Sequence, residues 1–137
     1  MNKLFDQLKP LAPAVLRWGI AAVFLWFGSQ QLIQTSMWLS FIPQSVIDIS
    51  HLSASTLVHL NGSFEIIFGL ALLFGYQTRI AALLLSLHMF EITSVVGYDA
   101  IGVRDFGLSV AALAVFLYGA DEFGLDAWRR KKNAALN

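Results

Sequence analysis

The sequence predicts an all-α integral membrane protein, a four-helix bundle with an interfacial loop or short helix between its first and second spans. Hydrophobic residues make up 57% of the 137 residues and charged residues only 13%, against about 25% charged residues in an average soluble domain. The mean hydropathy is +0.65, and a soluble protein of this size could not bury so much apolar side chain. Four stretches are also long and apolar enough to cross a bilayer.

The predicted spans cover about residues 11–33, 56–74, 80–96 and 101–120. The chain is long enough for one domain. We therefore expect residues 1–137 to form a single membrane domain, in which residues 121–137 are a basic tail on the cytoplasmic side.

The connections between the spans differ in character. Gly75-Tyr76-Gln77 is a tight turn, so the second and third spans are expected to be an antiparallel pair, and Gly97-Tyr98-Asp99 joins the third and fourth in the same way. Residues 35–55 are too polar and too broken to span. We expect them to lie on the membrane, with Trp38 at the level of the headgroups.

The distribution of Lys and Arg predicts the orientation. Lys3 and Lys9 precede the first span, Arg79 lies between the second and third, and a basic run over residues 129–132 follows the fourth. Residues 34–56 and the connection between the third and fourth spans hold no Lys or Arg. The positive-inside rule then places both termini in the cytoplasm, for a multi-pass protein of the plasma (inner) membrane.

Charge balance and cysteine content exclude several classes of function. Nine Lys and Arg balance nine Asp and Glu, so no broad basic face exists to attract nucleic acid. The chain has no cysteine, which excludes disulfides, thiolate metal sites and thiol redox chemistry carried by the chain itself. No complete catalytic motif occurs, so the sequence leaves open whether the protein is an enzyme; at most it is an oxidoreductase subunit.

Ionisable side chains inside predicted spans are costly, by about 2.5–3.5 kcal/mol on insertion scales, and call for an explanation. The helical rise places most of them between mid-membrane and the outer boundary, and their spacings put them on shared helix faces. We predict a polar ligand-binding cavity in the outer half of the bundle. The residues expected to line it are Glu65, His88, Glu91, Arg104, Asp105, Asn61 and Gln31.

Other interpretations of these residues stay open. An ion pair from Glu65 or Glu91 to Arg104 would satisfy the charges without any ligand. Arg17 lies about one turn from the cytoplasmic end and is expected to extend to the headgroups. Gly107-x-x-x-Ala111 has the spacing that lets a helix approach its neighbour closely. We predict no metal site, because carboxylate-bridged iron sites in helical bundles need more carboxylates and a second His.

Several motifs, taken in order, resemble the DoxX family of small four-span membrane proteins over about residues 12–126. They are Leu16-Arg17-Trp18-Gly19, Phe24-Leu25-Trp26-Phe27-Gly28, Phe64-Glu65-Ile66-Ile67-Phe68-Gly69-Leu70, Gly75, Thr78-Arg79-Ile80-Ala81-Ala82, Arg104-Asp105-Phe106-Gly107-Leu108 and Gly124-Leu125-Asp126. The sequence departs from the family pattern at Gln31, where many members have Lys. The resemblance implies a four-helix bundle in the plasma membrane and a link to redox chemistry, since relatives include a membrane subunit of a thiosulfate:quinone oxidoreductase.

Three functions follow from these observations. In the first, the protein is the membrane component of a redox-linked system (quinone, or thiol and sulfur stress) that binds a quinone and works with a soluble oxidoreductase partner. In the second, it is a non-enzymatic scaffold or assembly factor whose polar residues only hold the bundle together. In the third, it is a small transporter, which with so few spans would need a homo-oligomer. No cofactor is certain from the sequence; quinone is the candidate.

Overall fold

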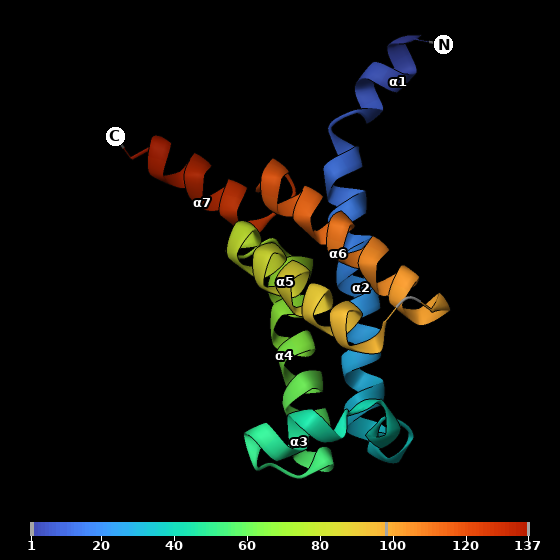
Figure 1. Ribbon diagram of the computed structural model, residues 1–137. Helices are drawn as coiled ribbons and strands as arrows, with labels where there is room; N and C mark the ends of the chain where they lie inside the picture. Colours follow the sequence, from blue (N-terminus) through green and yellow to red (C-terminus); the bar gives the residue numbers. More distant parts are fainter. Residues whose placement is uncertain (1, 98, 137) are drawn as a thin grey trace.

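The computed structural model describes residues 2–97 and 99–136, in which every regular element is a helix. Four helices are long and apolar enough to cross a membrane: α2 (Leu11–Ile33), α4 (Ala54–Phe74), α5 (Thr78–Val96) and α6 (Ala100–Tyr118) (Figure 1). They confirm the predicted all-α membrane fold, with ends within two residues of the predicted spans. Tyr98, in the predicted turn before α6, lies outside the described residues.

Short helices complete the chain. The predicted interfacial segment contains two 3-10 turns, η1 (Thr35–Met37) and η2 (Leu39–Phe41), and the short helix α3 (Gln44–Ser50). Two helices were not predicted: α1 (Asn2–Leu8) at the N-terminus and α7 (Leu125–Ala134) within the basic tail. The bundle therefore has an α3 end and an α7 end, and we use these two names below.

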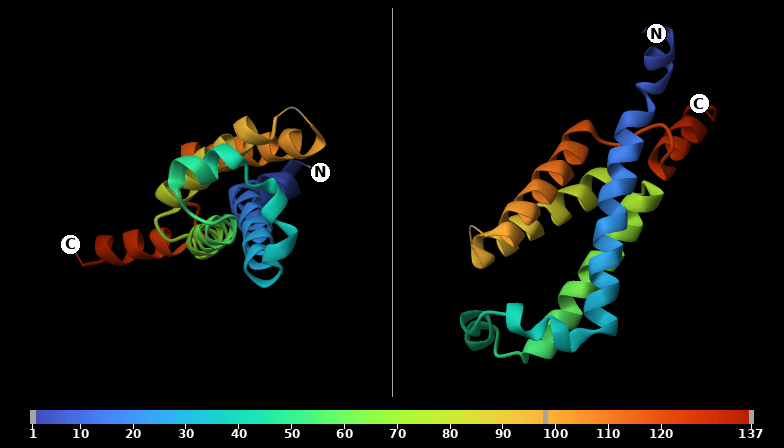
Figure 2. Two further views of the ribbon diagram at one scale, coloured as in Figure 1. Left: turned by 60° about the horizontal axis from the view of Figure 1, so that its bottom comes forward. Right: turned by 90° about the vertical axis from the view of Figure 1, so that its right-hand side faces the viewer.

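The four long helices form two antiparallel pairs rather than a uniform bundle. α2 packs along α4 and α5 packs along α6, whereas contacts between the two pairs are fewer. Figure 2 shows that the pairs meet near the α7 end and diverge toward the α3 end. The prediction of a close antiparallel pair therefore describes α5 and α6 better than α4 and α5, which make fewer contacts after the turn at Gly75.

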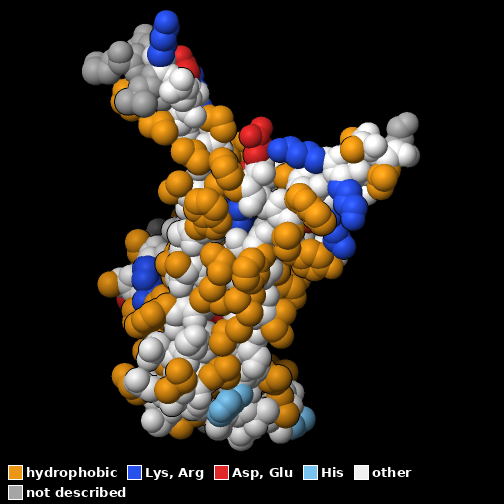
Figure 3. All heavy atoms as spheres, turned by 180° about the vertical axis from the view of Figure 1, so that it is seen from behind, with side chains coloured by type: hydrophobic (Ala, Val, Ile, Leu, Met, Phe, Trp, Pro, Cys, Tyr) orange, Lys and Arg blue, Asp and Glu red, His pale blue; other side chains and the backbone are white. Residues whose placement is uncertain are grey.

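The apolar core lies where the two pairs meet. Ile20 and Phe24 of α2, Leu72 of α4, and Leu85 and Met89 of α5 are buried in it, together with small residues of α5 and α6. Many large apolar side chains point outward from all four long helices. Figure 3 shows these hydrophobic side chains over the waist of the molecule, the arrangement expected of a protein whose solvent is lipid.

Candidate functional site

Two glycines bring α2 and α4 into close contact next to the candidate site. A methyl group at Gly28 would lie 2.7 Å from the Gly62 carbonyl oxygen, and one at Gly62 would lie 2.9 Å from the Gly28 carbonyl oxygen. Only glycine allows two backbones to approach so closely. By contrast, a methyl group at Gly107, the glycine singled out for close packing, would meet nothing within 4 Å. That prediction is wrong because Gly107 is on the outward face of α6.

Beside this contact, three polar side chains of α2 and α4 form a buried hydrogen-bond network. The Gln31 amide donates to Glu65 Oε2 at 2.9 Å, and Asn61 Nδ2 donates to Gln31 Oε1 at 2.7 Å and to Glu65 Oε1 at 3.2 Å. Glu65 is 2% exposed and Gln31 4%. Hydrogen bonds of this kind satisfy a buried carboxylate and fix the position of its two oxygens.

His88 of α5 completes what we call the Glu65 cluster, which consists of Gln31, Asn61, Glu65 and His88. His88 Nε2 lies 3.6 Å from Glu65 Oε1, which is too long for a hydrogen bond. This nitrogen is buried and has no hydrogen-bond partner within the described part of the chain. The ring packs against Phe64, with centroids 4.7 Å apart. The structure thus brings together four of the seven predicted residues, from three helices.

Arg104 and Asp105 do not join this cluster. They pair with each other, Arg104 Nε donating to Asp105 Oδ1 at 2.8 Å, so the alternative of an ion pair from Arg104 to Glu65 or Glu91 is wrong. Asp105 is buried, and the Arg104 guanidinium lies 4.7 Å from the centre of the Phe27 ring. Because Phe27 and Gln31 are four residues apart on α2, Arg104 lies about one helical turn from the cluster.

Glu91 is the second exception. It lies three residues beyond His88 on α5, but its side chain is exposed and forms no hydrogen bond or ion pair with another described residue. The expectation that His88 and Glu91 face the cluster together is therefore wrong for Glu91. The reason is tertiary: α5 diverges from α4 toward the α3 end, so a residue further along α5 is out of reach of Glu65.

A second group of buried charges lies at the α7 end, where α2, α4 and the α6–α7 connection meet. Arg17 donates to both carboxylate oxygens of Asp121, at 2.6 and 3.2 Å, and to the carbonyl oxygens of Leu72 and Leu73, both at 2.6 Å. Arg17 is 1% exposed. The prediction that it extends to the headgroups is wrong, because Asp121 and the free carbonyls at the end of α4 satisfy the guanidinium inside the protein.

Asp126, in the predicted tail, links α7 to the start of α5 at this end of the bundle. The Asp126 carboxylate accepts hydrogen bonds from the Gln77 and Thr78 backbone N–H groups and from the Thr78 hydroxyl, at 2.8–2.9 Å. The N-cap residue of α5, Gln77, makes no side-chain cap hydrogen bond. Asp126 of α7 therefore caps the first turn of α5 in its place. The backbones of Gly75 and Gly124 also meet here, since a methyl group at Gly124 would lie 3.1 Å from Gly75 Cα. We call the Arg17–Asp121 pair and the Asp126 cap, together with this Gly75–Gly124 contact, the α7 joint.

Sequence reasoning missed Asp121 and Asp126 because both lie outside the spans, where a carboxylate needs no explanation. The signal that could have found them is the presence of acidic residues after α6, because a tail that serves only as a basic anchor has no need of them. Burial by itself would raise the pKa of the Asp121 carboxyl. Hydrogen bonds from the Arg17 guanidinium and the Phe123 backbone N–H, with the charge of Arg17, outweigh it and hold that pKa below its usual value.

Comparison with known proteins agrees with this architecture. The family model described as DoxX matches residues 12–98, which contain α2 from its second residue onward, all of α4 and α5, and every residue of the Glu65 cluster. The match ends before α6, so the motifs at Arg104 and Gly124 lie beyond it. No curated protein and no solved structure matches the chain. The family match covers more than half of the 137 residues, and the chain belongs to the DoxX family.

Proposed function

We propose that this protein is the membrane component of a redox-linked system and that its Glu65 cluster binds the head group of a quinone. The observation that carries the proposal is His88 Nε2, which is buried, has no hydrogen-bond partner within the described residues and lies 3.6 Å from Glu65 Oε1. A buried polar atom without a partner costs about 1–3 kcal/mol. A ligand that hydrogen-bonds to this atom would recover that free energy.

The chemistry of the cluster suits a quinone. A quinone carbonyl accepts a hydrogen bond from an imidazole N–H, and the quinol hydroxyl donates to a carboxylate or to a neutral imidazole nitrogen. Phe64 and Phe68, whose ring centroids are 4.6 Å apart, provide apolar surface next to His88 for the ring and tail of such a ligand. Apolar walls with a few convergent polar groups are typical of small-molecule sites.

The redox step needs a partner. Reduction of a quinone to a quinol consumes two electrons and two protons. In the proposed system a soluble oxidoreductase exchanges the electrons, while Glu65 and His88 accept or deliver the protons. The excess of Lys and Arg at the α7 end supports placing that end, and with it both termini, in the cytoplasm of a cell with its quinone pool in the plasma membrane.

The test is native mass spectrometry of the protein purified in mild detergent, with quinone extracted from the same sample and its amount measured. We expect a bound quinone in the wild type and its loss in Glu65→Gln and His88→Gln. His59→Gln is the matched control, because His59 is exposed on the same helix as Glu65. Wild-type protein without quinone, or full retention by both cluster variants, would contradict the proposal.

A scaffold function is the second candidate, and one observation favours it. Gln31, Asn61 and Glu65 satisfy one another and tie α2 to α4, which is what a structural network would do. His88→Gln separates the two functions, because His88 Nε2 makes no hydrogen bond that the fold could lose. Loss of quinone, with a melting temperature equal to that of the wild type when both are quinone-free, supports the redox function. A stoichiometric protein partner without quinone supports the scaffold.

A further inference from the structure

An apolar groove between α4 and α5 opens on the surface that faces lipid, near the α7 end. Its volume is about 420 Å³, within the range of about 300–1,000 Å³ for small-molecule sites. Phe68 and Phe74 of α4, Ile80 of α5 and Leu125 of α7 line it, and Tyr76 lies at its polar end. Ile80 and Phe74 are more than half exposed, so the groove is open along its length.

Two cations follow Leu125 on α7, beyond the Tyr76 end of this groove: Arg129 over the ring of Tyr76, which lines the groove, and Lys132 one turn further along, over the ring of Trp128. The Arg129 guanidinium is 5.3 Å from the centre of the Tyr76 ring, and Lys132 Nζ is 5.4 Å from the centre of the Trp128 ring. Within the described part of the chain neither makes an ion pair or donates a hydrogen bond. Leu125 precedes these residues by four and seven positions, so one face of α7 presents all three.

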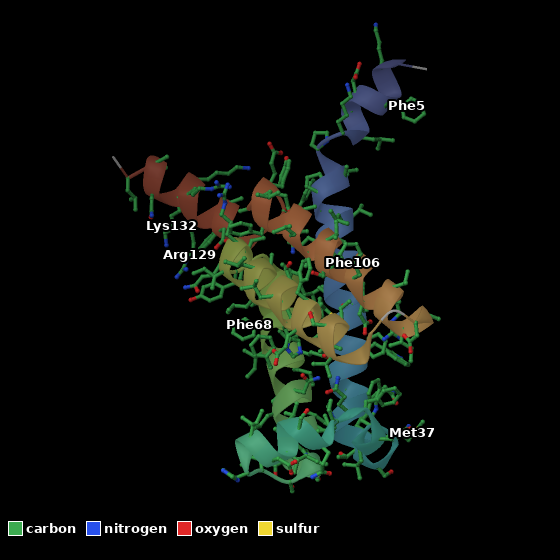
Figure 4. All side chains as sticks on the ribbon, in the orientation of Figure 1. Phe5, Met37, Phe68, Phe106, Arg129 and Lys132 are labelled. Atoms are coloured by element: carbon green, nitrogen blue, oxygen red, sulfur yellow. The ribbon has the colours of Figure 1, made fainter. Side chains whose placement is uncertain are left out.

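The figures show this arrangement. Figure 4 places Arg129 and Lys132 on the same side of α7, with Phe68 further along the molecule below them. Figure 3 shows Lys and Arg side chains beside hydrophobic surface at this end. The two cations lie over the rings of Tyr76 and Trp128. Tyr and Trp are the residue types enriched where a membrane meets water.

We propose that this groove binds one anionic phospholipid, with an acyl chain along α4 and α5 and the phosphate between Arg129 and Lys132. This groove shares Phe68 with the proposed quinone site, but no residue of the Glu65 cluster lines it. The ligand of the groove must combine a long apolar part with an anionic group, because the groove is apolar and the cations lie only beyond its end. A neighbouring groove of about 400 Å³ fits this ligand less well, since Glu122 lines it and would repel the phosphate.

Such a lipid would contact α4, α5 and α7 at once. The α7 joint already fixes α7 to the start of α5, through Asp126 and Thr78. A bound lipid would add contacts between the same elements, so its binding should stabilise the docked position of α7. Lipid binding and the melting temperature of the full chain are therefore expected to change together.

The test is a lipid titration of the full chain in detergent, followed by native mass spectrometry and thermal melting. The probes are phosphatidylglycerol, phosphatidylcholine with the same acyl chains, and glycerol phosphate. We expect one phosphatidylglycerol to bind in preference to phosphatidylcholine and to raise the melting temperature, and glycerol phosphate to bind far more weakly. Arg129→Gln and Lys132→Gln should each weaken phosphatidylglycerol binding by roughly fivefold.

Matched variants separate this site from general attraction to charge. Lys131→Gln removes the same charge from a different face of α7, since Lys131 is not four or seven positions from Leu125, and should leave binding nearly unchanged. Ala71→Phe fills the groove while keeping every cation, and should weaken binding of phosphatidylglycerol. Equal binding of both lipids, equal effects of Lys131→Gln and Arg129→Gln, or glycerol phosphate binding as tightly as the lipid would each overturn the proposal.

Discussion

The Glu65 cluster and the α7 joint both bury charged side chains, but they differ in how that charge is satisfied. In the joint, Arg17 makes four hydrogen bonds and the carboxylates of Asp121 and Asp126 are each held by several donors. In the cluster, His88 Nε2 has no partner among the described residues. Complete satisfaction indicates a structural role, whereas an unsatisfied buried atom indicates a place for a ligand.

The largest expected effect comes from breaking the ion pair of the joint. Asp121→Asn leaves the Arg17 charge buried without its counter-ion, so we expect a loss of about 3–5 kcal/mol in the free energy of unfolding. Thermal melting in detergent measures it. The double variant Arg17→Met/Asp121→Asn should be more stable than Asp121→Asn alone, because it removes the uncompensated charge. A melting temperature for Asp121→Asn equal to that of the wild type would show that the joint is not structural.

The backbone contact of the joint should be the next most sensitive. Gly75 has φ +65°, and a methyl group there would lie 2.5 Å from Gly124 Cα. Gly75→Ala is expected to cost about 1–3 kcal/mol from strain at this position. Gly107→Ala is the control, since a methyl group there meets nothing and alanine is the better helix former, by about 0.5–1 kcal/mol. The two variants should shift the melting temperature in opposite directions.

Gln31→Leu tests the hydrogen bonds of the Glu65 cluster. It removes the donor to Glu65 and the acceptor for Asn61, leaving buried polar groups unpaired at a cost of about 1–3 kcal/mol. In quinone-free protein its effect on stability should exceed that of His88→Gln, which breaks no hydrogen bond. If His88→Gln were the more destabilising of the two, the cluster would be held together by His88 and the argument for a ligand at its ring would fail.

The joint should also make stability depend on pH in acid. The pKa of Asp121 is lowered in the folded state, so its ionised form stabilises the fold above the ordinary pKa of 3.8. This contribution is lost as the pH falls through 3.8 toward the lowered value of the folded state. Melting temperatures between pH 7 and pH 3 should therefore fall more steeply for the wild type than for Asp121→Asn. If the melting temperatures of the two proteins fell equally steeply with pH, the prediction would be wrong.

Glu91→Gln should have the smallest effect. Glu91 is exposed and forms no hydrogen bond with another described residue, so the free energy of unfolding should change by less than about 0.5 kcal/mol. Quinone binding should also be retained, in contrast to Glu65→Gln. A loss of bound quinone in Glu91→Gln comparable to that in Glu65→Gln would show that Glu91 belongs to the quinone site.

The class of the protein, the positions of its four spans and the four residues of the Glu65 cluster could all be predicted from the amino-acid sequence. These follow from local properties: a run of apolar residues must be helical in lipid, because only then are its backbone groups satisfied. A polar residue in such a run is expected to turn inward, as Glu65 does, although Glu91 does not. Asn61 and Glu65 could be placed together because four residues make one helical turn.

Which of the polar faces meet depends on how the helices pack, and could not be predicted from the sequence. The crossing of the two helix pairs brings His88 to Glu65 but leaves Glu91 exposed, although both lie on α5. The return of the chain after α6 brings Asp121 to Arg17, across 104 positions of sequence. Helical periodicity says which side of a helix a residue occupies, but the angle between helices depends on side-chain packing along the whole contact, and no single motif encodes it.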